Sequence, residues 1–352
     1  MSTDQEHRLI PWPKGTGRIS DSFRRPLHDL RISVMDRCNF RCPYCMPEDK
    51  YHKHFRFLRA SERLSFEEIV RLTGIFAGLG VRKLRITGGE PLLRSNLHDL
   101  IGDLGRIDEV EDIALTTNGV LLGSQAAALK AAGLDRVTVS LDSLDDKVFA
   151  TMTGGRGSKG RVLKSIREAQ EAGLKPIKIN AVVEKGVNDH TVLDLLDYFR
   201  GRGVIVRLIE YMDVGNINHW RQSDMVPSKA LVELINERWL IRPVAQNYRG
   251  EVANRYVYED GAGEIGFISS VTEPFCGACT RARLSSDGRL FTCLFASEGT
   301  DLKGPLRAGA TNDELLDIIV GVWERRNDRY SELRASLKRR GKDKVEMYYI
   351  GG

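Results

Sequence analysis

The six cysteines of this 352-residue chain form two tight groups, and none is left over. The first group has the spacing C-x3-C-x2-C and comprises Cys38, Cys42 and Cys45; the second comprises Cys276, Cys279 and Cys293. Three cysteines in so short a loop cannot all pair with one another, so metal ligation is favoured over a disulfide framework. Three thiolates can hold zinc with a fourth ligand from elsewhere, or three irons of a four-iron cluster whose last iron stays open.

The presence or absence of a fourth protein ligand distinguishes a zinc site from a four-iron cluster. The histidines nearest to the first group are His52 and His54, and the second group has no histidine nearby. A four-iron cluster needs only three thiolates, and its open iron can bind a substrate or a cofactor. The two groups therefore favour iron–sulfur clusters, and zinc remains the alternative.

Length and composition are those of an ordinary globular protein, with 41% hydrophobic and 29% charged residues. No apolar run is long enough to span a membrane, and Asp4, Glu6, Pro11 and Pro13 interrupt the start of the chain where a secretory signal would need apolar residues. We therefore expect a cytoplasmic protein with no membrane partner. The net charge of +5 is mild and fits a polyanion pocket, a nucleic-acid surface or no charged partner at all.

A series of strand and helix units must position the first cysteine group. Strands are predicted at 31–35, 82–87, 112–117, 136–141, 175–183 and 204–211, and helices at 65–80, 96–106, 123–132, 159–172 and 189–202. Six such units predict an α/β fold whose parallel sheet curls into a partial (β/α)6 TIM-like barrel, with sites at the C-terminal ends of the strands. We expect an N-terminal arm over 1–30, the barrel over 31–225, and a smaller C-terminal cluster-binding region over 226–352.

Polar and apolar residues alternate along these strands, which places the polar side chains on one face of the sheet. That face carries Arg31, Ser33, Lys83, Arg85, Thr87, Thr116, Asn118, Thr138, Ser140, Asp142, Lys178, Asn180 and Arg207. A parallel sheet buried on both faces is normally apolar throughout, so this face predicts a cavity for a polar ligand. The alternative is an antiparallel-style sheet with one solvated face.

The first cysteine loop, with Tyr44 before its last cysteine, closely resembles the signature of radical S-adenosylmethionine (SAM) enzymes. The segment Gly88-Gly89-Glu90-Pro91 resembles the glycine-rich segment of that family. Further motifs narrow the resemblance to the GTP 3′,8-cyclases of molybdenum-cofactor biosynthesis: segments 31–34, 116–119 and 140–143, the C-x2-C-x13-C group with Leu294-Phe295, and the terminal Gly-Gly. The resemblance covers about residues 20–352. It departs from the family pattern at Met35, Thr280 and Ala282.

This resemblance implies a role for each motif. Cys38, Cys42 and Cys45 would hold a [4Fe-4S] cluster that cleaves SAM, and Cys276, Cys279 and Cys293 would hold a second [4Fe-4S] cluster that meets the guanine base. The residues around SAM would be Tyr44, Gly89, Ser140 and Met212. The residues around GTP would be Arg31, Lys83, Arg85, Thr116, Lys178, Arg207, Arg281 and Arg283. The resemblance also implies catalytic roles for Arg281, Arg283, Gly351 and Gly352.

The implied reaction is the first step of molybdenum-cofactor biosynthesis. A 5′-deoxyadenosyl radical would take the hydrogen at C3′ of GTP, and the C3′ radical would add to C8, giving 3′,8-cyclo-7,8-dihydro-GTP after reduction. The implied partners are an electron donor such as a flavodoxin and the cyclic pyranopterin monophosphate synthase downstream. We also expect a homodimer, although no sequence feature sets the oligomeric state.

Two other functions fit parts of the sequence. A radical SAM enzyme that modifies a peptide would also carry an auxiliary cluster, although such enzymes usually have more than three C-terminal cysteines. A zinc-stabilised protein could bind nucleic acid through the basic stretch 338–344, and it would contain zinc and bind in a salt-dependent manner. The GTP assignment predicts no nucleic-acid partner.

Overall fold

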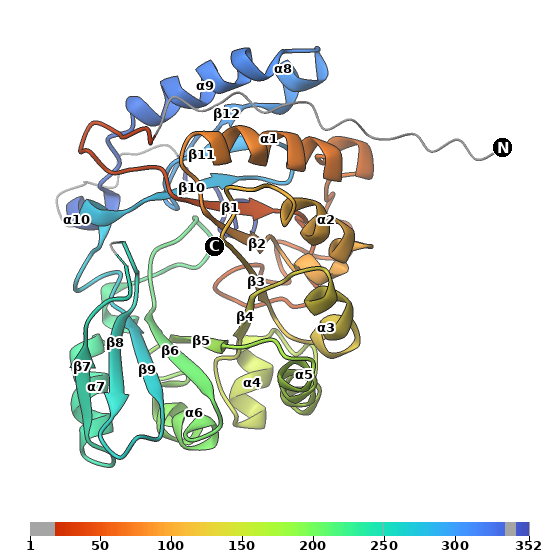
Figure 1. Cartoon of the computed structure of the whole chain (residues 1–352). Coiled ribbons are helices and arrows are strands. Elements are labelled where there is room, and N and C mark those ends of the chain that lie inside the picture. Colours follow the sequence, from red (N-terminus) through yellow and green to blue (C-terminus); the bar gives the residue numbers. More distant parts are fainter. Residues whose placement is uncertain (1–17, 249, 335–342, 352) are drawn as a thin grey trace.

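The computed structural model describes residues 18–248, 250–334 and 343–351. The strands form one 12-stranded sheet in the order β12-β11-β10-β1-β2-β3-β4-β5-β6-β9-β8-β7, which curves around the centre of the molecule (Figure 1). The first six strands are parallel neighbours: β1 (Asp29–Ser33), β2 (Lys83–Thr87), β3 (Asp112–Thr117), β4 (Arg136–Ser140), β5 (Ile177–Val183) and β6 (Val204–Glu210). The predicted α/β partial barrel is therefore confirmed.

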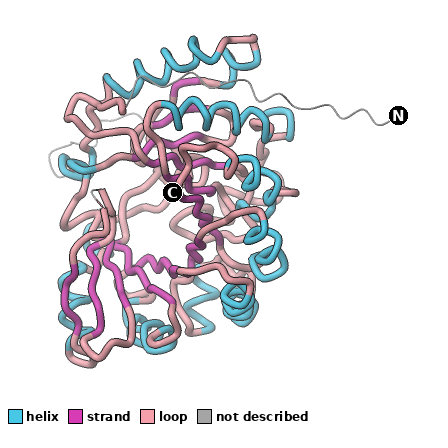
Figure 2. The backbone as a smooth tube through the Cα atoms, in the orientation of Figure 1, coloured by secondary structure: helices cyan, strands magenta, loops and turns pink. Residues whose placement is uncertain are grey.

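Helices connect these strands and cover the outer side of the curve, while the strands lie inside (Figures 1 and 2). They are α1 (Phe66–Gly78), α2 (Leu97–Leu104), α3 (Leu122–Ala131), α4 (Asp146–Met152), α5 (Lys159–Glu171) and α6 (Val192–Phe199). The Ser65 side chain accepts a hydrogen bond from the Glu68 N–H and the Glu68 carboxylate accepts one from the Ser65 N–H, which fixes the start of α1. Helix α4 was not predicted, because its seven residues are too few to show a helical period.

The C-terminal part of the chain continues the same sheet at both edges. Strand β10 (Arg281–Leu284) pairs in parallel with β1, and β9 (Glu264–Ile268) pairs in parallel with β6. Antiparallel strands then extend each edge: β11 (Arg289–Phe291) and β12 (Thr300–Asp301) beyond β10, and β8 (Asn254–Tyr258) and β7 (Ile241–Val244) beyond β9. The remaining helices are α7 (Ser228–Asn236), α8 (Lys303–Arg307), α9 (Asn312–Glu324) and α10 (Tyr330–Leu333). The run of βα units thus ends before the predicted boundary at residue 225, whereas the sheet continues beyond it.

The predicted N-terminal arm is wrong for its second half. Leu27 and Leu30 have no exposed surface, Arg25 is 1% exposed, and β1 begins at Asp29. The polar composition of this segment suggested a solvated arm, whereas Asp21 and Arg25 form an ion pair inside the protein. Residues 1–17 lie outside the described part of the chain.

The two faces of the sheet differ as the alternation predicts. Ile32, Leu84 and Ile86 are buried between the sheet and the helices. On the inner face, Arg31 lies in register between Arg85 of β2 and Arg283 of β10. Because β1–β6 are parallel, the alternative of an antiparallel sheet with a solvated face is excluded.

The buried carboxylate of Glu210 joins the barrel to the C-terminal part. Glu210 ends β6, is 1% exposed, and accepts hydrogen bonds from the backbone N–H groups of Ser228, Val271 and Thr272 at 2.8–2.9 Å. Its oxygens also accept from the Ser228 and Thr272 hydroxyls. One side chain therefore fixes the start of α7 and the loop after β9.

Glu210→Ala is expected to lower the free energy of unfolding by roughly 3 kcal/mol or more, because it leaves buried N–H groups without an acceptor. Anaerobic urea denaturation of the reconstituted protein measures this change. Glu233→Ala is the control, because Glu233 is exposed on α7. Equal stability of the two variants would show that Glu210 does not hold the junction.

Candidate active site

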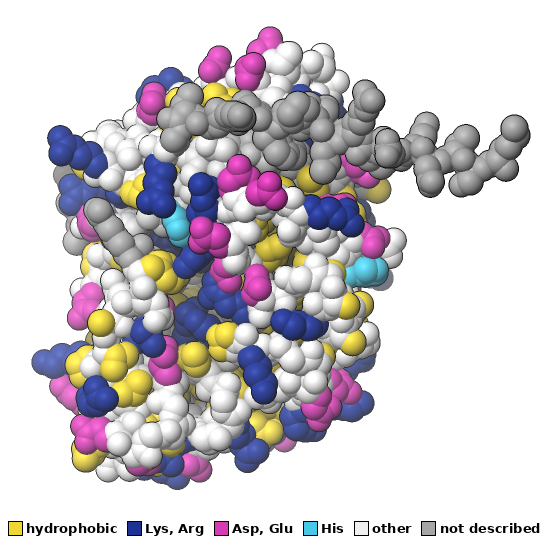
Figure 3. Space-filling view, in the orientation of Figure 1, with side chains coloured by type: hydrophobic (Ala, Val, Ile, Leu, Met, Phe, Trp, Pro, Cys, Tyr) yellow, Lys and Arg dark blue, Asp and Glu magenta, His cyan; other side chains and the backbone are white. Residues whose placement is uncertain are grey.

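Two adjoining cavities open toward the inner face of the sheet. The larger, of ≈ 240 Å³, is lined by Cys276, Cys279 and Cys293, and the smaller, of ≈ 130 Å³, by Cys38, Cys42 and Cys45. Thr116 and Met347 line both, so the cavities share a wall. Figure 3 shows a hollow on this face with Lys and Arg side chains inside it.

The first cysteine loop follows β1, and hydrogen bonds shape it around its thiols. The N–H groups of Cys45 and Met46 donate to the Cys42 carbonyl at 3.0 and 2.8 Å, and Asn118 Nδ2, beyond β3, lies 3.8 Å from Cys38 Sγ. Burial, and then the Glu90 carboxylate, raise the pKa of the Cys38 thiol to about 11. A thiol with this pKa is protonated at neutral pH, so metal binding would have to displace its proton.

The glycine-rich segment packs directly on that loop. A Cβ at Gly88 would lie 2.3 Å from the Met35 carbonyl oxygen, and a Cβ at Gly89 would lie 2.3 Å from that of Arg37. The Gly89 N–H already donates to the Met35 carbonyl at 2.7 Å. The close packing of the cysteine loop on this segment therefore requires glycine at both positions. Both glycines also line the smaller cavity.

A buried carboxylate holds the predicted SAM-site tyrosine. Tyr44 Oη donates to Asp142 Oδ2 at 2.8 Å, and the Val182 N–H donates to Asp142 Oδ1 at 2.9 Å. Burial raises the pKa of Asp142 to about 6. Tyr44, Gly89 and Ser140 line the smaller cavity, whereas Met212, predicted beside SAM, lines the larger one.

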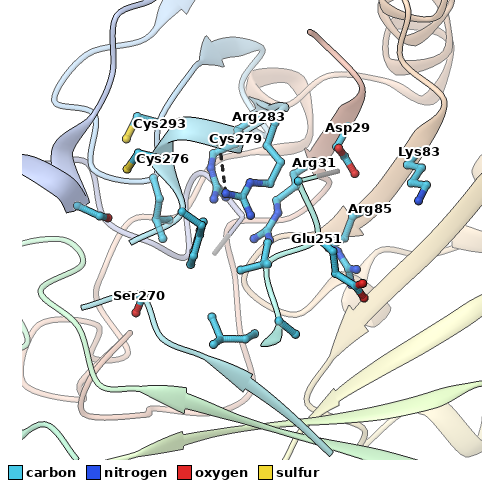
Figure 4. A pocket seen from close by; sticks show the side chains of 18 of the residues that line it. Asp29, Arg31, Lys83, Arg85, Glu251, Ser270, Cys276, Cys279, Arg283 and Cys293 are labelled. Atoms are coloured by element: carbon cyan, nitrogen blue, oxygen red, sulfur yellow. Dashed lines mark hydrogen bonds between the residues drawn. The ribbon is translucent and has the colours of Figure 1, made fainter. Parts of the chain in front are cut away.

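The β10–β11 hairpin assembles the second cysteine group. Cys276 begins a short 3-10 helix (Cys276–Ala278), Cys279 precedes β10, and Cys293 follows β11. Arg281 Nη2 lies 3.3 Å from Cys279 Sγ, and the cysteines share one wall with Arg283 (Figure 4). Burial acts to raise the pKa of Cys279, but the Arg281 and Arg326 guanidiniums outweigh it and lower this pKa to about 6.

All six cysteines are free. Within the described residues, no three His, Cys, Asp or Glu side chains converge on a single metal ion. Each group instead presents three separate thiols to one cavity. This donor set fits a multi-iron cluster held by thiolates.

Cations from five strands line the larger cavity. They are Arg31, Lys83, Arg85, Arg136, Arg207, Arg281 and Arg283, and Arg25 and Arg326 join them from outside the strands. Burial, and then the charges of neighbouring arginines, lower the pKa of Arg85 and of Arg283 to about 10. Asp29, Asp112 and Glu251 also line this cavity and offset only part of the positive charge. The excess of cations fits an anion with several negative charges. Two buried oxygens that line the cavity, Asn180 Oδ1 and Ser270 Oγ, make no hydrogen bond among the described residues and could accept one from the same ligand.

Three other residues predicted to bind GTP either contact other side chains of the protein or lie outside the two cavities. Thr116 Oγ1 accepts a hydrogen bond from Arg85 Nη1 at 3.0 Å. Lys83 Nζ lies 3.3 Å from the centre of the Tyr248 ring. Lys178 is 8% exposed on the same sheet face, but it does not line either of these two cavities.

The C-terminal segment reaches the cations. The Gly351 carbonyl accepts hydrogen bonds from Arg31 Nη1 at 3.4 Å and from Arg283 Nη1. Tyr348 packs edge-on against Tyr51, with ring centroids 5.0 Å apart, and Ile350 has no exposed surface. The predicted catalytic residue Gly352 lies outside the described residues.

Asn118 and Asp142 were predicted on the polar face of the sheet, and both line the smaller cavity just beyond β3 and β4, where the C-terminal ends of parallel strands meet. Two other residues in these walls, Tyr248 and Met347, were not singled out from the sequence. They lie in irregular segments with no such signal. The described residues contain no helix long and apolar enough to cross a membrane.

Comparison with known proteins agrees with this geometry. Residues 32–199 match the Radical SAM superfamily, and residues 204–332 match the family described as Molybdenum Cofactor Synthesis C. The structure of Streptococcus suis SuiB bound to S-adenosylmethionine has a TM-score of 0.58 with this chain at 16% identity, covering 90% of this chain and 70% of SuiB. The fold and the first cysteine loop thus define a radical SAM protein.

Two relatives specify the family more closely. A GTP 3′,8-cyclase of Xanthomonas campestris pv. campestris (strain 8004) is 52% identical over 334 residues, covering 95% of this chain and 97% of the relative. A GTP 3′,8-cyclase of Acidothermus cellulolyticus is 49% identical over 361 residues, covering 96% and 100%. The chain belongs to the GTP 3′,8-cyclase family.

Proposed function

We infer that this chain is a GTP 3′,8-cyclase that carries out the first step of molybdenum-cofactor biosynthesis. The observation that carries the inference is a set of buried and half-buried cations that line one cavity together with three thiols, next to a second cavity lined by the other three thiols. A single-cluster radical enzyme needs only the first group. Cations and a second thiol group together fit a substrate that has both a triphosphate and a base.

Within this proposal, Cys38, Cys42 and Cys45 hold one [4Fe-4S] cluster, and Tyr44, Gly89 and Ser140 surround SAM. Cys276, Cys279 and Cys293 hold a second [4Fe-4S] cluster. When bound, these groups supply a 5′-deoxyadenosyl radical for hydrogen removal at C3′ and an iron that meets the guanine base. The shared wall of the two cavities supports this division, since it brings both sites to one substrate.

The protein's own residues bind and orient the nucleotide. The guanidiniums of Arg31, Arg85 and Arg283 provide paired donors for phosphate oxygens, and the sheet fixes their spacing because the three residues are in register. Held in this way, C3′ lies at the shared wall, where Thr116 separates the two cavities. The segment that carries Met347 closes the same wall and excludes water from the radical.

We propose that the enzyme acts in the cytoplasm as a homodimer, takes electrons from a flavodoxin-like donor, and delivers its product to cyclic pyranopterin monophosphate synthase. Six free thiols support a reducing compartment. Zinc and nucleic-acid binding form the competing hypothesis, and iron analysis separates the two. About eight irons per reconstituted chain support two four-iron clusters, whereas stoichiometric zinc would overturn the proposal.

Anaerobic incubation of the reconstituted protein with GTP deuterated at C3′, with SAM and with a one-electron reductant such as dithionite tests the reaction. We expect deuterium in 5′-deoxyadenosine and formation of the cyclised nucleotide. The variant Cys276→Ala/Cys279→Ala/Cys293→Ala should retain about half of the iron and form no cyclised product. Equal formation of 5′-deoxyadenosine without GTP, or no transfer of deuterium, would contradict the assignment.

Lys178 lies on the same face of β5 as Asn180, which lines the larger cavity, so we propose that Lys178 approaches the bound triphosphate, and the pH dependence of GTP affinity tests this role. Burial, and then the charges of Arg207 and Arg136, lower the pKa of Lys178 to about 7. The free enzyme therefore binds fewer protons than a triphosphate complex above pH 7, and the Kd for GTP should rise with pH, by up to about tenfold per unit. Calorimetry in buffers of different ionisation heat would detect the proton taken up.

Lys178→Met should remove this pH dependence, while Lys164→Met should retain it, because Lys164 is exposed on α5. An unchanged slope in Lys178→Met would show that Lys178 does not contact the nucleotide.

A further inference from the structure

A group of buried charges lies directly behind the second cysteine group. Asp21 and Arg25 precede β1, and Arg326 follows α9; they are 6%, 1% and 4% exposed. Arg25 Nε donates to Asp21 Oδ2 at 2.6 Å, and Arg326 Nη1 donates to the same oxygen at 3.2 Å. Segments about 300 residues apart in sequence therefore meet at one carboxylate.

Both arginines also hold the backbone of the cysteine turn. Arg25 Nη1 donates to the Cys276 carbonyl at 2.7 Å and to the Asp328 carbonyl at 2.8 Å. Arg326 Nη1 donates to the Cys279 carbonyl at 2.8 Å. Two of the three thiol-bearing residues are thus fixed through their own carbonyls.

The fully buried part of this group carries more positive than negative charge. Two guanidiniums share the fully buried Asp21 carboxylate, and the next carboxylate, Asp328, is 30% exposed and 3.5 Å from Arg326 Nε. Arg25 Nη2 makes no hydrogen bond within the described residues, and Arg25 lines the larger cavity. A buried positive charge is costly unless negative charge lies nearby, and cysteine thiolates around a cluster would supply it.

We propose that Asp21, Arg25 and Arg326 are positioning residues for the second cluster. The arginines hold the carbonyls of Cys276 and Cys279, Asp21 orients both guanidiniums, and their positive charge stabilises the thiolates and the reduced cluster. This proposal rests on the second cluster proposed above. It also gives the N-terminal segment before β1 a function, since Arg25 reaches the cavity from there.

The test uses the full-length chain reconstituted anaerobically with iron and sulfide. In Arg25→Gln and Arg326→Gln, we expect iron of the second cluster to pass to a chelator about 10- to 100-fold faster than in the unmodified protein. The reduction potential of the second cluster should fall, because a nearby positive charge favours the reduced form. The first cluster serves as an internal reference and should be unchanged.

Matched variants separate positioning from general stability. Arg71→Gln is the control, because Arg71 also ties α9 to the barrel, through Asn312 and the Ala310 carbonyl, without touching the cysteine turn. Arg326→Lys keeps the charge but not the fork of donors, so it should restore the potential more than the iron retention. Melting temperatures report any loss of fold common to Arg326→Gln and Arg71→Gln.

The outcomes distinguish this proposal from the one on which it rests. About four irons per unmodified chain would overturn the second cluster itself. About eight irons, with release rates and potentials in Arg25→Gln and Arg326→Gln equal to those of Arg71→Gln, would overturn the positioning role alone.

Discussion

Replacing Arg283 with alanine is expected to slow GTP cyclisation strongly while both cysteine groups still bind iron. Arg283 is 5% exposed, lies in register with Arg31, and donates to the carbonyl of Gly351. Its loss removes one charge from the proposed phosphate site and one anchor of the segment that closes the cavity. We expect kcat/KM to fall by about 10²- to 10³-fold, as when an enzyme loses a buried donor to a developing or bound anion.

The measurement combines iron content, 5′-deoxyadenosine formation and nucleotide product. Arg289→Ala is the matched control, because Arg289 lies on the same hairpin with a side chain 48% exposed and should leave turnover unchanged. Iron loss in Arg283→Ala would show a structural role instead, and full turnover would exclude Arg283 from the GTP site.

Gly351→Ala, which adds a methyl group, should lower kcat/KM by up to about 100-fold. This loss is comparable to the one expected when a reacting group is displaced by about 1 Å. Gly351 has φ +68°, where side chains are strained, and an added Cβ would lie 2.3 Å from Thr87 Cγ2. The segment would have to withdraw, and the Gly351 carbonyl would lose Arg31 and Arg283.

Two further variants isolate the steric contact. Gly309→Ala has similar strain at φ +91° but meets no atom within 4 Å, so it should leave activity unchanged. Thr87→Ser removes the obstructing methyl and should restore part of the activity of Gly351→Ala. Full activity of Gly351→Ala, or no restoration by Thr87→Ser, would argue against this contact.

The barrel could be predicted because its determinants are local. Strand alternation and the capping box at Ser65 predict elements within a short window, and the same alternation placed Arg31 and Arg85 on the inner face. The pairing of β1 with β10 is set by contacts between segments far apart in sequence, which no local pattern encodes. A separate C-terminal region was therefore predicted from the sequence, although in the structure this part of the chain completes the sheet.

The residues of the candidate site also divide into those that local sequence could reveal and those that only long-range contacts bring together. Both cysteine groups could be found from their spacing, because the three members of each group lie close together in the chain. The Asp21–Arg25–Arg326 group was missed because each residue, taken alone, reads as an ordinary surface charge. Only folding brings Asp21 and Arg326 together and removes them from water.

The pairing of β1 with β10 also sets the order in which this protein can fold. Thr280 Oγ1 reaches Asp29 across 251 residues, so one edge of β1 stays open until most of the chain has left the ribosome. An open strand edge invites wrong pairing, and contacts of such long range slow folding. The first cysteine loop, directly after β1, is thus synthesised early but enclosed late. Cutting the chain between its two family-matched segments would uncover β1 and β5 together, because their partners β10 and β6 both belong to the second segment, so we expect the two segments to fold as one unit.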